Sequence, residues 1–376
     1  MSHSDSPRIL VAPLDWGLGH AARCIPVIRE LQNQGAQVII LGSPRVLAYL
    51  NVHISNLEQI PSNDTGVKYS SWLPAWLKIL LQANIIKRSI QDEYTNLQSL
   101  IKIHQIDAIV SDNRYGLYAK SIPSILITHQ VQPLTPRFLR FTQAFSNKRF
   151  LQLLKPFSEI WIPDLDSNKI SGRLAHVFSD SISVKNVGLL SRFGANLPPI
   201  KSSNSILAII SGPEPQRSIF FQEIVRLQNA FFADTSIICE NFPDKVSAAS
   251  LENIRIILQP NDEQFIQEIE RTQHLICRSG YSSIMDFIRL NRTALLIPTP
   301  GQTEQEYLSE RCQKLGFTQA TQRQLKDIKT NAELEVLFPS AKSPDLIISN
   351  EPEYSKAALK KAIESLLSRI ASHAKD

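Results

Sequence analysis

Short apolar runs alternate with amphipathic segments along the first half of the chain. The run RILVAP (8–13) is typical of a strand buried on both faces, and HAARCIPVIRELQNQ (20–34) has apolar residues at helical spacing and stops at Gly35. Further apolar runs, each ending in polar residues, are AQVIILGS (36–43), IDAIVSD (106–112), SILITH (124–129) and EIWIPD (159–164). Apolar strands separated by helices predict a parallel, doubly wound α/β sheet.

The same alternation begins again after VGLLSRFGANLPPIKSSN (187–204), whose Gly, Pro and Ser residues are typical of a linker. SILAIIS (205–211) predicts a strand, and SIFFQEIVRLQNAFF (218–232) predicts the helix that follows it. Further strands are expected at SIICEN, IRIILQP, HLICRS and ALLIPTP, and a last amphipathic helix at PEYSKAALKKAIESLLSRIA. We therefore predict a Rossmann-like domain, a linker, a second Rossmann-like domain and a C-terminal helix over residues 1–190, 191–204, 205–350 and 351–376, respectively.

Polar residues that follow the strands of the first half are candidates for a binding site, because ligands of such sheets bind beyond the carboxyl ends of the strands. These residues are Asp15 to His20, Asp112 to Gly116, His129 with Gln130, and Asp164. Two domains of this kind leave a central cleft between them, and we expect the substrates to bind there.

The composition limits the classes to which this protein can belong. Its 376 residues suit two domains, and 43% hydrophobic with 20% charged residues is typical of a soluble globular protein. No segment has the roughly 20 uncharged apolar residues of a membrane span, and the polar start of the chain predicts no secretory signal. The four cysteines are scattered, which favours a cytoplasmic protein without a disulfide framework or a CxxC zinc site. A net charge of +5 is too weak to predict a nucleic-acid partner, although it suits anionic substrates or an anionic membrane face.

The stretch GLGHAA (17–22) after the first strand matches the G-x-G-x-x-A pattern of dinucleotide-binding folds. That fold also needs an acidic residue after the second strand to bind the ribose of NAD, but LGSPR (41–45) contains none. Ser43 and Arg45 could instead bind the 2′-phosphate of NADP, so NADP is the dinucleotide alternative that stays open. His20 stands at the start of the predicted helix, where the helix dipole disfavours a charged imidazole. A neutral imidazole is a candidate general base, and a histidine that merely caps the turn is the equal alternative.

Two segments of the second half carry a more specific pattern, CRSGYSSIMDF (277–287) and LLIPTPGQTEQEYLSERCQKLGF (295–317). Free amides and hydroxyls at the turn from strand to helix in the first segment suit a diphosphate. The residues concerned are Arg278, Ser279, Gly280, Ser282 and Ser283. An ordinary strand and turn followed by a serine-capped helix is the alternative for each of them taken alone.

Carboxylate and amide groups follow this turn at positions suited to sugars. Asp286 lies one helical turn further, where its carboxylate can accept both hydroxyls of a ribose. Gln305 and Glu306 begin the next predicted helix with groups suited to the hydroxyls of a sugar. A diphosphate beside a ribose describes a nucleotide, and a sugar beyond it describes a nucleotide sugar.

The motifs GLGHAARCIP (17–26) and RSGYSSIMDF…IPTPGQTEQEY (278–307) resemble those of GT-B glycosyltransferases of the family 28 type. That group includes the enzyme that adds N-acetylglucosamine to the lipid-linked peptidoglycan precursor, and the resemblance covers nearly the whole chain. It implies two Rossmann-like domains that face a central cleft, with the acceptor on the first and a nucleotide sugar, expected to be UDP-linked, on the second. It also implies a hexosyl or N-acetylhexosaminyl transfer with inversion to the hydroxyl of a sugar or a lipid-linked glycan. Neither a metal nor another cofactor is expected.

The resemblance also implies roles for single residues. Donor binding is expected at Gly212, Arg217, Arg278, Ser279, Gly280, Tyr281, Ser282, Ser283, Asp286, Gln305 and Glu306. His20 is expected to be the base, with the nearby Asp112 as the alternative base or the group that orients it, and Gly17, Gly19 and His129 are expected on the acceptor side. Turn caps at Asp112 and His129 and a solvated charge at Arg217 are the alternatives.

Two residues depart from the family pattern. Arg23 stands where a proline is frequent, and the resulting GHxxR is similar to hydrolases that remove UDP from nucleotide sugars, so that water is the alternative acceptor. Glu306 stands where the peptidoglycan enzyme has a second glutamine, which leaves the donor sugar open. A non-catalytic protein that binds nucleotide sugars is a third alternative, from another class.

Three further patterns have an ordinary structural interpretation beside a functional one. Asp164-Leu165-Asp166 has the spacing of a metal-binding DxD motif, although a turn is favoured. The segment SWLPAWLKILLQANIIKRSI (71–90) has a wide apolar face that favours burial over a membrane-surface helix. The aromatic residues and cations of RFLRFTQAFSNKRFLQLLK (137–155) add modest support to the membrane alternative, a peripheral contact with the inner face of a membrane.

Overall fold

The computed structural model describes residues 6–62, 83–194, 197, 205–212, 214–231, 234–242, 251, 253–339 and 351–373. These residues form two compact units, and the chain passes from the first to the second between Arg192 and Phe193. The helix at the end of the chain belongs to the first unit. Most of the predicted linker, and residues 71–82 of the predicted apolar face, lie outside the described residues.

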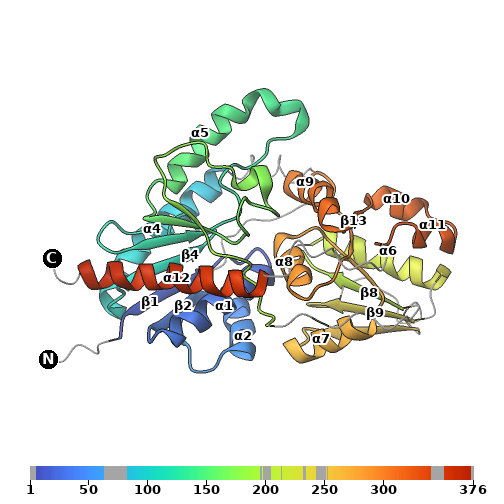
Figure 1. Ribbon diagram of the computed structural model, residues 1–376, viewed down its shortest axis with the longest axis horizontal. Helices are drawn as coiled ribbons and strands as arrows, with labels where there is room; N and C mark the ends of the chain where they lie inside the picture. Colours follow the sequence, from blue (N-terminus) through green and yellow to red (C-terminus); the bar gives the residue numbers. More distant parts are fainter. Residues whose placement is uncertain are drawn as a thin grey trace. The chain divides into compact units, whose positions relative to one another are not determined.

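A seven-stranded sheet forms the centre of the first unit (Figure 1). Its strands are β1 (Arg8–Pro13), β2 (Gln37–Gly42), β3 (Glu58–Pro61), β4 (Ala108–Asp112), β5 (Ser124–Ile127), β6 (Glu159–Ile162) and β7 (Val184–Asn186). They lie in the order β3-β2-β1-β4-β5-β6-β7, and all neighbours are parallel. The predicted parallel sheet is therefore confirmed, and its order reverses between β1 and β4, where doubly wound sheets bind ligands.

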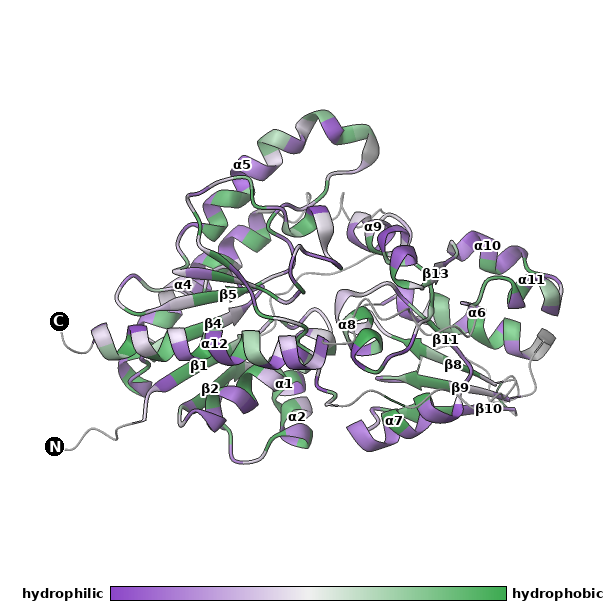
Figure 2. Cartoon of the chain, in the orientation of Figure 1, coloured by the Kyte–Doolittle hydropathy of each residue, from purple (hydrophilic) through white to green (hydrophobic). Residues whose placement is uncertain are grey.

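Helices pack on both faces of this sheet. They are α1 (Leu18–Asn33), α2 (Pro44–His53), α4 (Ala83–His104), η1 (Arg137–Thr142), α5 (Gln143–Leu154), η2 (Gly172–Ala175) and α12 (Glu351–His373). Alternate residues of β1 point to opposite faces. Ile9 and Val11 join the core formed with α1, α2 and α12, and Leu10 joins the core formed with α4. Figure 2 shows the result as largely apolar strands flanked by helices of mixed hydropathy.

The C-terminal helix α12 is part of the first unit. Leu359, Ile363 and Leu366 are buried in the same core as α1. Ser355 on this helix accepts a hydrogen bond from the Leu189 backbone amide at 2.8 Å. The adjacent Gly188 has a φ of 75°, and a Cβ atom there would lie 2.3 Å from the Ser355 Cα. Only glycine permits this contact, because both the backbone angle and the space exclude a side chain.

Replacing Gly188 by Ala is expected to lower the free energy of unfolding by about 2–5 kcal/mol, from the left-handed backbone and the collision with α12 together. Gly35 is the matched control, because its φ is 84° but nothing lies within 4 Å of the place that a Cβ atom would take. Gly35→Ala is expected to cost about 1–2 kcal/mol, the backbone contribution alone. Urea denaturation of the two variants measures the difference, and equal losses would contradict the tight packing of α12.

A six-stranded sheet forms the centre of the second unit. Its strands are β8 (Ser205–Ile210), β9 (Asp234–Cys239), β10 (Ile254–Leu258), β11 (His274–Cys277), β12 (Leu295–Leu296) and β13 (Thr318–Gln319), in the order β10-β9-β8-β11-β12-β13. All neighbours are parallel. The helices are α6 (Gln216–Phe231), α7 (Asp262–Arg271), α8 (Tyr281–Arg289), α9 (Thr303–Cys312), α10 (Gln322–Asp327) and α11 (Asn331–Glu335), with the short η4 (Gln313–Leu315) after α9. The second Rossmann-like domain is thus also confirmed.

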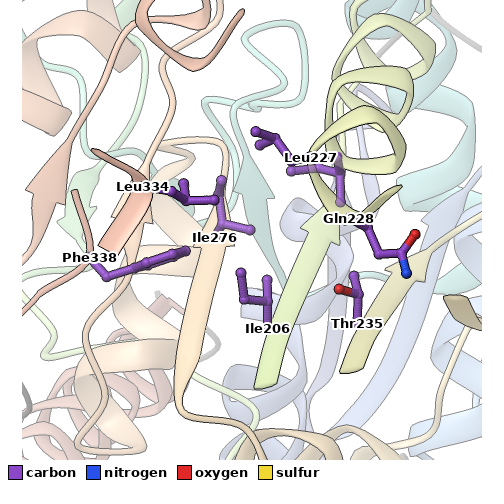
Figure 3. A pocket seen from close by; sticks show the side chains of 8 residues that line it. Ile206, Leu227, Gln228, Thr235, Ile276, Leu334 and Phe338 are labelled. Atoms are coloured by element: carbon purple, nitrogen blue, oxygen red, sulfur yellow. The ribbon is translucent and has the colours of Figure 1, made fainter. Parts of the chain in front are cut away.

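The core of the second unit is closely filled. A cavity of about 10 Å³ lies beside Ile206, Ile276 and Phe338 (Figure 3). That volume is about the room that one water molecule needs, so the cavity is a packing gap and not a nucleotide site. None of the helices in the described part of the chain combines the length and the apolar character needed to cross a bilayer.

Candidate functional site

Four polar side chains of the first unit meet at the carboxyl ends of its central strands. His20 and Arg23 lie one helical turn apart on α1, which follows β1 directly. Asp112 is the last residue of β4, and its carbonyl oxygen accepts a hydrogen bond from Leu14 just beyond β1 at 3.1 Å. His129 follows β5. Because β1, β4 and β5 are adjacent, parallel pairing brings residues distant in sequence to one edge of the sheet.

Asp112 is the centre of this group. One of its oxygens lies 3.3 Å from Nδ1 of His20 and accepts a hydrogen bond from Nε of Arg23 at 2.7 Å. Its second oxygen accepts from the other end of the Arg23 guanidinium. Asp112 is fully buried and the Arg23 side chain is 1% exposed, whereas His20 keeps 20% of its side-chain surface in contact with solvent. His20 is therefore the member of the group that a substrate can reach most readily.

The charges of the group follow from burial and from the arginine. Burial by itself raises the pKa of Asp112, but the Arg23 guanidinium and His20 outweigh it and lower that pKa to about 2. Burial lowers the pKa of His20 below its ordinary value of 6.5, and the attraction of Asp112 only partly opposes this. At neutral pH the aspartate is charged and the imidazole is neutral. We assign the imidazole proton to Nδ1, facing the carboxylate, which leaves a lone pair on Nε2.

This geometry bears on the two predicted roles of Asp112. A carboxylate that is fully buried, held at both oxygens by Arg23 and acidic to about pH 2 is a poor proton acceptor. These contacts favour the alternative in which Asp112 orients His20 over the one in which it is the base. The predicted helix-start position of His20 also needs a small correction, since α1 begins at Leu18.

Arg23 is the member that the sequence did not identify. We noted it only as a departure from a family pattern, although its position three residues after His20 puts it on the same face of α1. One of its terminal nitrogens also lies 3.4 Å from Nδ1 of His129. His129, which is predicted on the acceptor side, is buried, and its ring packs against this group.

The glycine loop before α1 has the backbone that the close turn requires. Gly17 is the N-cap residue of α1 with a φ of 146°, and Gly19 lies in the first turn of that helix. Ser43 and Arg45 do not support an NADP site, because both contact Asp15: Ser43 donates a hydrogen bond to it, and Arg45 lies 3.1 Å from its other oxygen. The dinucleotide alternative thereby loses its phosphate-binding groups.

Asp164 of the DLD pattern is a turn cap. Its carboxylate accepts hydrogen bonds from the amides of Leu165 and Ser171, both at 2.7 Å, and from the Ser171 hydroxyl at 2.6 Å. Asp166 accepts a hydrogen bond from Tyr354 at 2.6 Å. These contacts account for the motif as a turn.

The predicted diphosphate site of the second unit lies at the start of α8. Gly280 is the N-cap residue, and Ser282 and Ser283 are half-buried in the first turn. Asp286 is half-buried one turn further along α8. The amides of the first turn of a helix have no partner within the helix and attract anions. Tyr281 is buried in the core, so its side chain is not placed to contact a donor.

The side chains of Arg278 and Ser279, two residues predicted to contact the donor, point into the second unit. Arg278 is 2% exposed, and its guanidinium carbon lies 4.4 Å from the centre of the Phe220 ring. The guanidinium nitrogens donate hydrogen bonds to neutral oxygens, which belong to Ile297, Pro298, Gln216 and Gln322. Burial lowers its pKa to about 10, so it stays charged at neutral pH. Ser279 is fully buried and donates to the Gln305 carbonyl at 2.8 Å. Arg278 is therefore a buried positive charge held by neutral partners of the second unit.

Gln305 and Glu306 close the turn between β12 and α9. The Gln305 side-chain oxygen accepts a hydrogen bond from the Thr299 amide at 2.8 Å, and a Glu306 oxygen accepts from the Gly301 amide at 3.0 Å. We expected both to face a sugar, and the structure uses their oxygens to shape the loop. Both residues lie in the first turn of α9, directly after that loop.

Arg217 is paired within its own unit. It lies 2.7 Å from Glu214 and 3.8 Å from Glu240, so its charge is already balanced by carboxylates. Gly212, which precedes α6, has a φ of 101° and open space around it. The glycine thus has the backbone of a tight turn, whereas Arg217 does not have the arrangement expected for a diphosphate ligand.

Solved structures share the fold of the whole chain. The glycotransferase of kitacinnamycin superposes with a TM-score of 0.66 at 14% identity and covers 98% of this chain and 100% of its own. The UGT2 of Phytolacca americana, complexed with UDP-2fluoro-glucose and pterostilbene, superposes with a TM-score of 0.59 at 13% identity over 99% and 100% of the two chains. The spinosyn forosaminyltransferase SpnP gives 0.57 at 12% identity over the full length of both. The sequence matches no protein-family model and no curated protein.

These likenesses show the architecture. The chain has the GT-B fold of glycosyltransferases, built from two Rossmann-like α/β domains. The identities are too low to carry a substrate or a mechanism from one protein to the other, so the function has to be argued from the residues of this chain.

Proposed function

We propose that this protein is a glycosyltransferase that moves a sugar from a nucleotide donor, with UDP as the expected nucleotide, to an acceptor hydroxyl. The observation that carries the proposal is the neutral His20, oriented by the buried carboxylate of Asp112 at the switch point of a GT-B fold. A neutral imidazole held by a carboxylate is the arrangement that general-base chemistry requires.

The proposed reaction is a single displacement with inversion. The acceptor oxygen bonds to the anomeric carbon while its proton passes to Nε2 of His20, and the bond between that carbon and the phosphate oxygen breaks. Asp112 stabilises the resulting imidazolium, and its permanent charge means that no reorganisation is needed. The leaving nucleotide diphosphate takes the electron pair, and the first-turn amides of α8 with the buried charge of Arg278 compensate it without a metal.

Donor binding is proposed at the start of α8 in the second unit. Gly280, Ser282 and Ser283 provide amides and hydroxyls for the diphosphate, and Asp286 provides a carboxylate for the ribose. The loop closed by Gln305 and Glu306 lies at the following strand end, where the transferred sugar is expected. The resemblance to family 28 supports a hexose or N-acetylhexosamine as that sugar, and a sugar or lipid-linked glycan as the acceptor.

Hydrolysis of the nucleotide sugar is the second candidate, because Arg23 completes the GHxxR pattern of such hydrolases and contacts Asp112 directly. The two reactions differ only in the acceptor. Purified protein incubated with UDP-sugars distinguishes them: a transferase releases UDP slowly until an acceptor hydroxyl is added, whereas rapid release in buffer alone would make water the acceptor and overturn the transferase proposal.

Nucleotide binding is expected to stabilise the protein in a thermal-shift measurement. A ligand at about 100 times its Kd adds about 2.7 kcal/mol to the stability of the folded state, so UDP and UDP-sugars should raise Tm and NADP should not. Asp286→Ala is expected to remove most of the shift that UDP causes. Asp327→Ala is the control, since this exposed residue lies on α10 of the same unit. A shift with NADP, or an equal shift in Asp286→Ala, would contradict the proposed donor site.

A further inference from the structure

Three phenylalanines on η1 and α5 are exposed to solvent. Phe138, Phe141 and Phe145 keep 64%, 83% and 64% of their surface accessible. Elsewhere in the described residues, no stretch of eight positions exposes three large apolar side chains. Contiguous exposed apolar surface on a soluble protein marks an interaction site more often than a random surface does.

Exposed cations lie on the same two elements as these rings. Arg140, Lys148 and Arg149 are exposed on the same two elements, and the Arg149 guanidinium lies 5.1 Å from the centre of the Phe145 ring. Residues 137–155 contain five Lys or Arg residues and neither Asp nor Glu. We call the six side chains Phe138, Arg140, Phe141, Phe145, Lys148 and Arg149 the η1–α5 face. This face therefore combines three apolar rings with three positive charges.

The fold holds this face in place. Gln143, at the junction of η1 and α5, accepts hydrogen bonds from the amide and the hydroxyl of Thr135, both at 2.9 Å, and donates to Pro133 and Asn147. On its other side, α5 buries Leu151 and Leu154 in the first unit. With one side anchored, the opposite side is directed to solvent by the structure. Figure 1 shows α5 at the margin of the first unit.

A hollow of about 360 Å³ opens beside Phe145, lined also by Lys148, Arg149 and Gln152. Two cations and an amide offer hydrogen-bond donors to phosphate oxygens, while the phenyl ring offers apolar contact beside them. This pairing of phosphate and hydrocarbon is the chemistry of a phospholipid at the surface of a bilayer.

We propose that the η1–α5 face docks the protein onto a membrane surface that carries anionic phospholipids. The three phenyl rings enter the boundary between headgroups and acyl chains, and the three cations contact lipid phosphates. Charge complementarity selects this occupant, because the face carries three cations, and the segment that contains it, residues 137–155, has five cations and no carboxylate. The proposal concerns where the enzyme works, so it goes beyond sugar transfer and does not depend on it.

Vesicle co-sedimentation of the full chain tests the proposal. Binding is expected to vesicles that contain about 30% phosphatidylglycerol and not to pure phosphatidylcholine, and to weaken as salt rises. The triple variant F138S/F141S/F145S is expected to lose at least about tenfold in binding, as is R140Q/K148Q/R149Q. Unchanged binding in these variants, or no binding by the natural chain, overturns the proposal.

Matched controls separate this face from general surface effects. V52S/I85S/I103S removes three other exposed apolar side chains of the first unit, and K102Q/K120Q/K356Q removes three other exposed cations of that unit. Both should bind vesicles as the natural chain does, and equal losses in the controls overturn the assignment. If circular dichroism shows that a triple variant does not fold, the single variant F141W still tests the proposal. Its tryptophan fluorescence emission should shift to the blue when anionic vesicles are added, and the emission of I103W should not.

Two further measurements test whether the η1–α5 face binds something other than a membrane. Inorganic phosphate at matched ionic strength should leave vesicle binding unchanged, and its displacement of the protein would identify a site for a soluble phosphate compound. Single-stranded RNA also combines phosphates with surfaces that stack on aromatic rings. RNA binding that disappears in F138S/F141S/F145S would overturn the membrane proposal in favour of a nucleic-acid site.

Discussion

His20→Ala is expected to lower kcat by about 10²–10⁴-fold while the affinity for the nucleotide sugar stays nearly unchanged. The imidazole lies in the first unit, 92 residues in sequence from the carboxylate that orients it, whereas the proposed donor groups lie on α8 of the second unit. Its loss therefore removes the proton acceptor and leaves donor binding intact. Steady-state kinetics with a fixed acceptor, together with the thermal shift caused by UDP, measure both quantities.

The pH dependence of the same reaction provides a second readout. The base acts in its neutral form, and burial holds the pKa of His20 below 6.5. The rate should therefore rise with pH through a pKa below that value and stay level at neutral pH, and His20→Ala should lose this acidic limb. His176→Ala, which removes an exposed histidine of the first unit, is the control and should retain both rate and profile. An unaltered kcat in His20→Ala would remove His20 from the role of base.

Arg23→Met is expected to destabilise the protein by about 3–5 kcal/mol, because it leaves the buried Asp112 without its cation. The natural guanidinium contacts both carboxylate oxygens in an environment where the arginine side chain is 1% exposed. Methionine keeps much of the volume and none of the charge. Urea denaturation at neutral pH measures the loss, and Arg88→Met, an exposed arginine on α4, should cost little.

Lowering the pH should reduce the stability of the natural protein and relieve the destabilisation of the Arg23→Met variant. The folded pKa of Asp112, about 2, lies below its ordinary 3.8, so its contribution to stability is complete above pH 3.8 and is lost as the pH falls toward 2. Without Arg23, burial raises that pKa, and protonation relieves the variant. The difference in stability between the two should shrink as the pH falls. A constant difference, or a loss below about 1 kcal/mol at neutral pH, would contradict the buried pair.

The double variant R23M/D112N separates stability from catalysis. Removal of both charges leaves no uncompensated ion, so much of the stability lost in Arg23→Met should return. The rate should stay low, because an amide can no longer stabilise the imidazolium form of His20. A recovery of rate together with stability would mean that Asp112 serves only the packing of the first unit.

The alternation of apolar runs with amphipathic helices predicted both sheets, because a strand buried on two faces needs apolar residues at nearly every position. β1 shows this directly, with Leu10 and Val11 in different cores. The ends of the strands likewise indicated where His20 and Asp112 would lie, since parallel pairing aligns the carboxyl ends of β1 and β4. The local sequence pattern was sufficient for the features that depend only on the burial of a strand or a helix.

The direction in which each side chain points could not be predicted from these local sequence patterns. Arg278 and Ser279 have residue types suited to a phosphate, yet packing turns both side chains inward. The side-chain oxygens of Gln305 and Glu306, which lie on α9, accept hydrogen bonds from amides of the loop before that helix. Arg23 was treated only as a departure from the family pattern, because no local pattern indicates which carboxylate it contacts. Its partner Asp112 lies 89 residues away.

The sequence by itself thus determined the two doubly wound domains, the strand ends at which chemistry is placed and the histidine at the start of α1. Tertiary structure decided which charges meet: Asp112 lies beside His20 because β4 pairs with β1, and it stays ionised despite its burial because the Arg23 guanidinium contacts both of its oxygens. It also decided that α12, at the far end of the chain, completes the core of the first unit. Periodicity records the burial of each segment, whereas the pairing of charges depends on contacts between segments that no local pattern encodes.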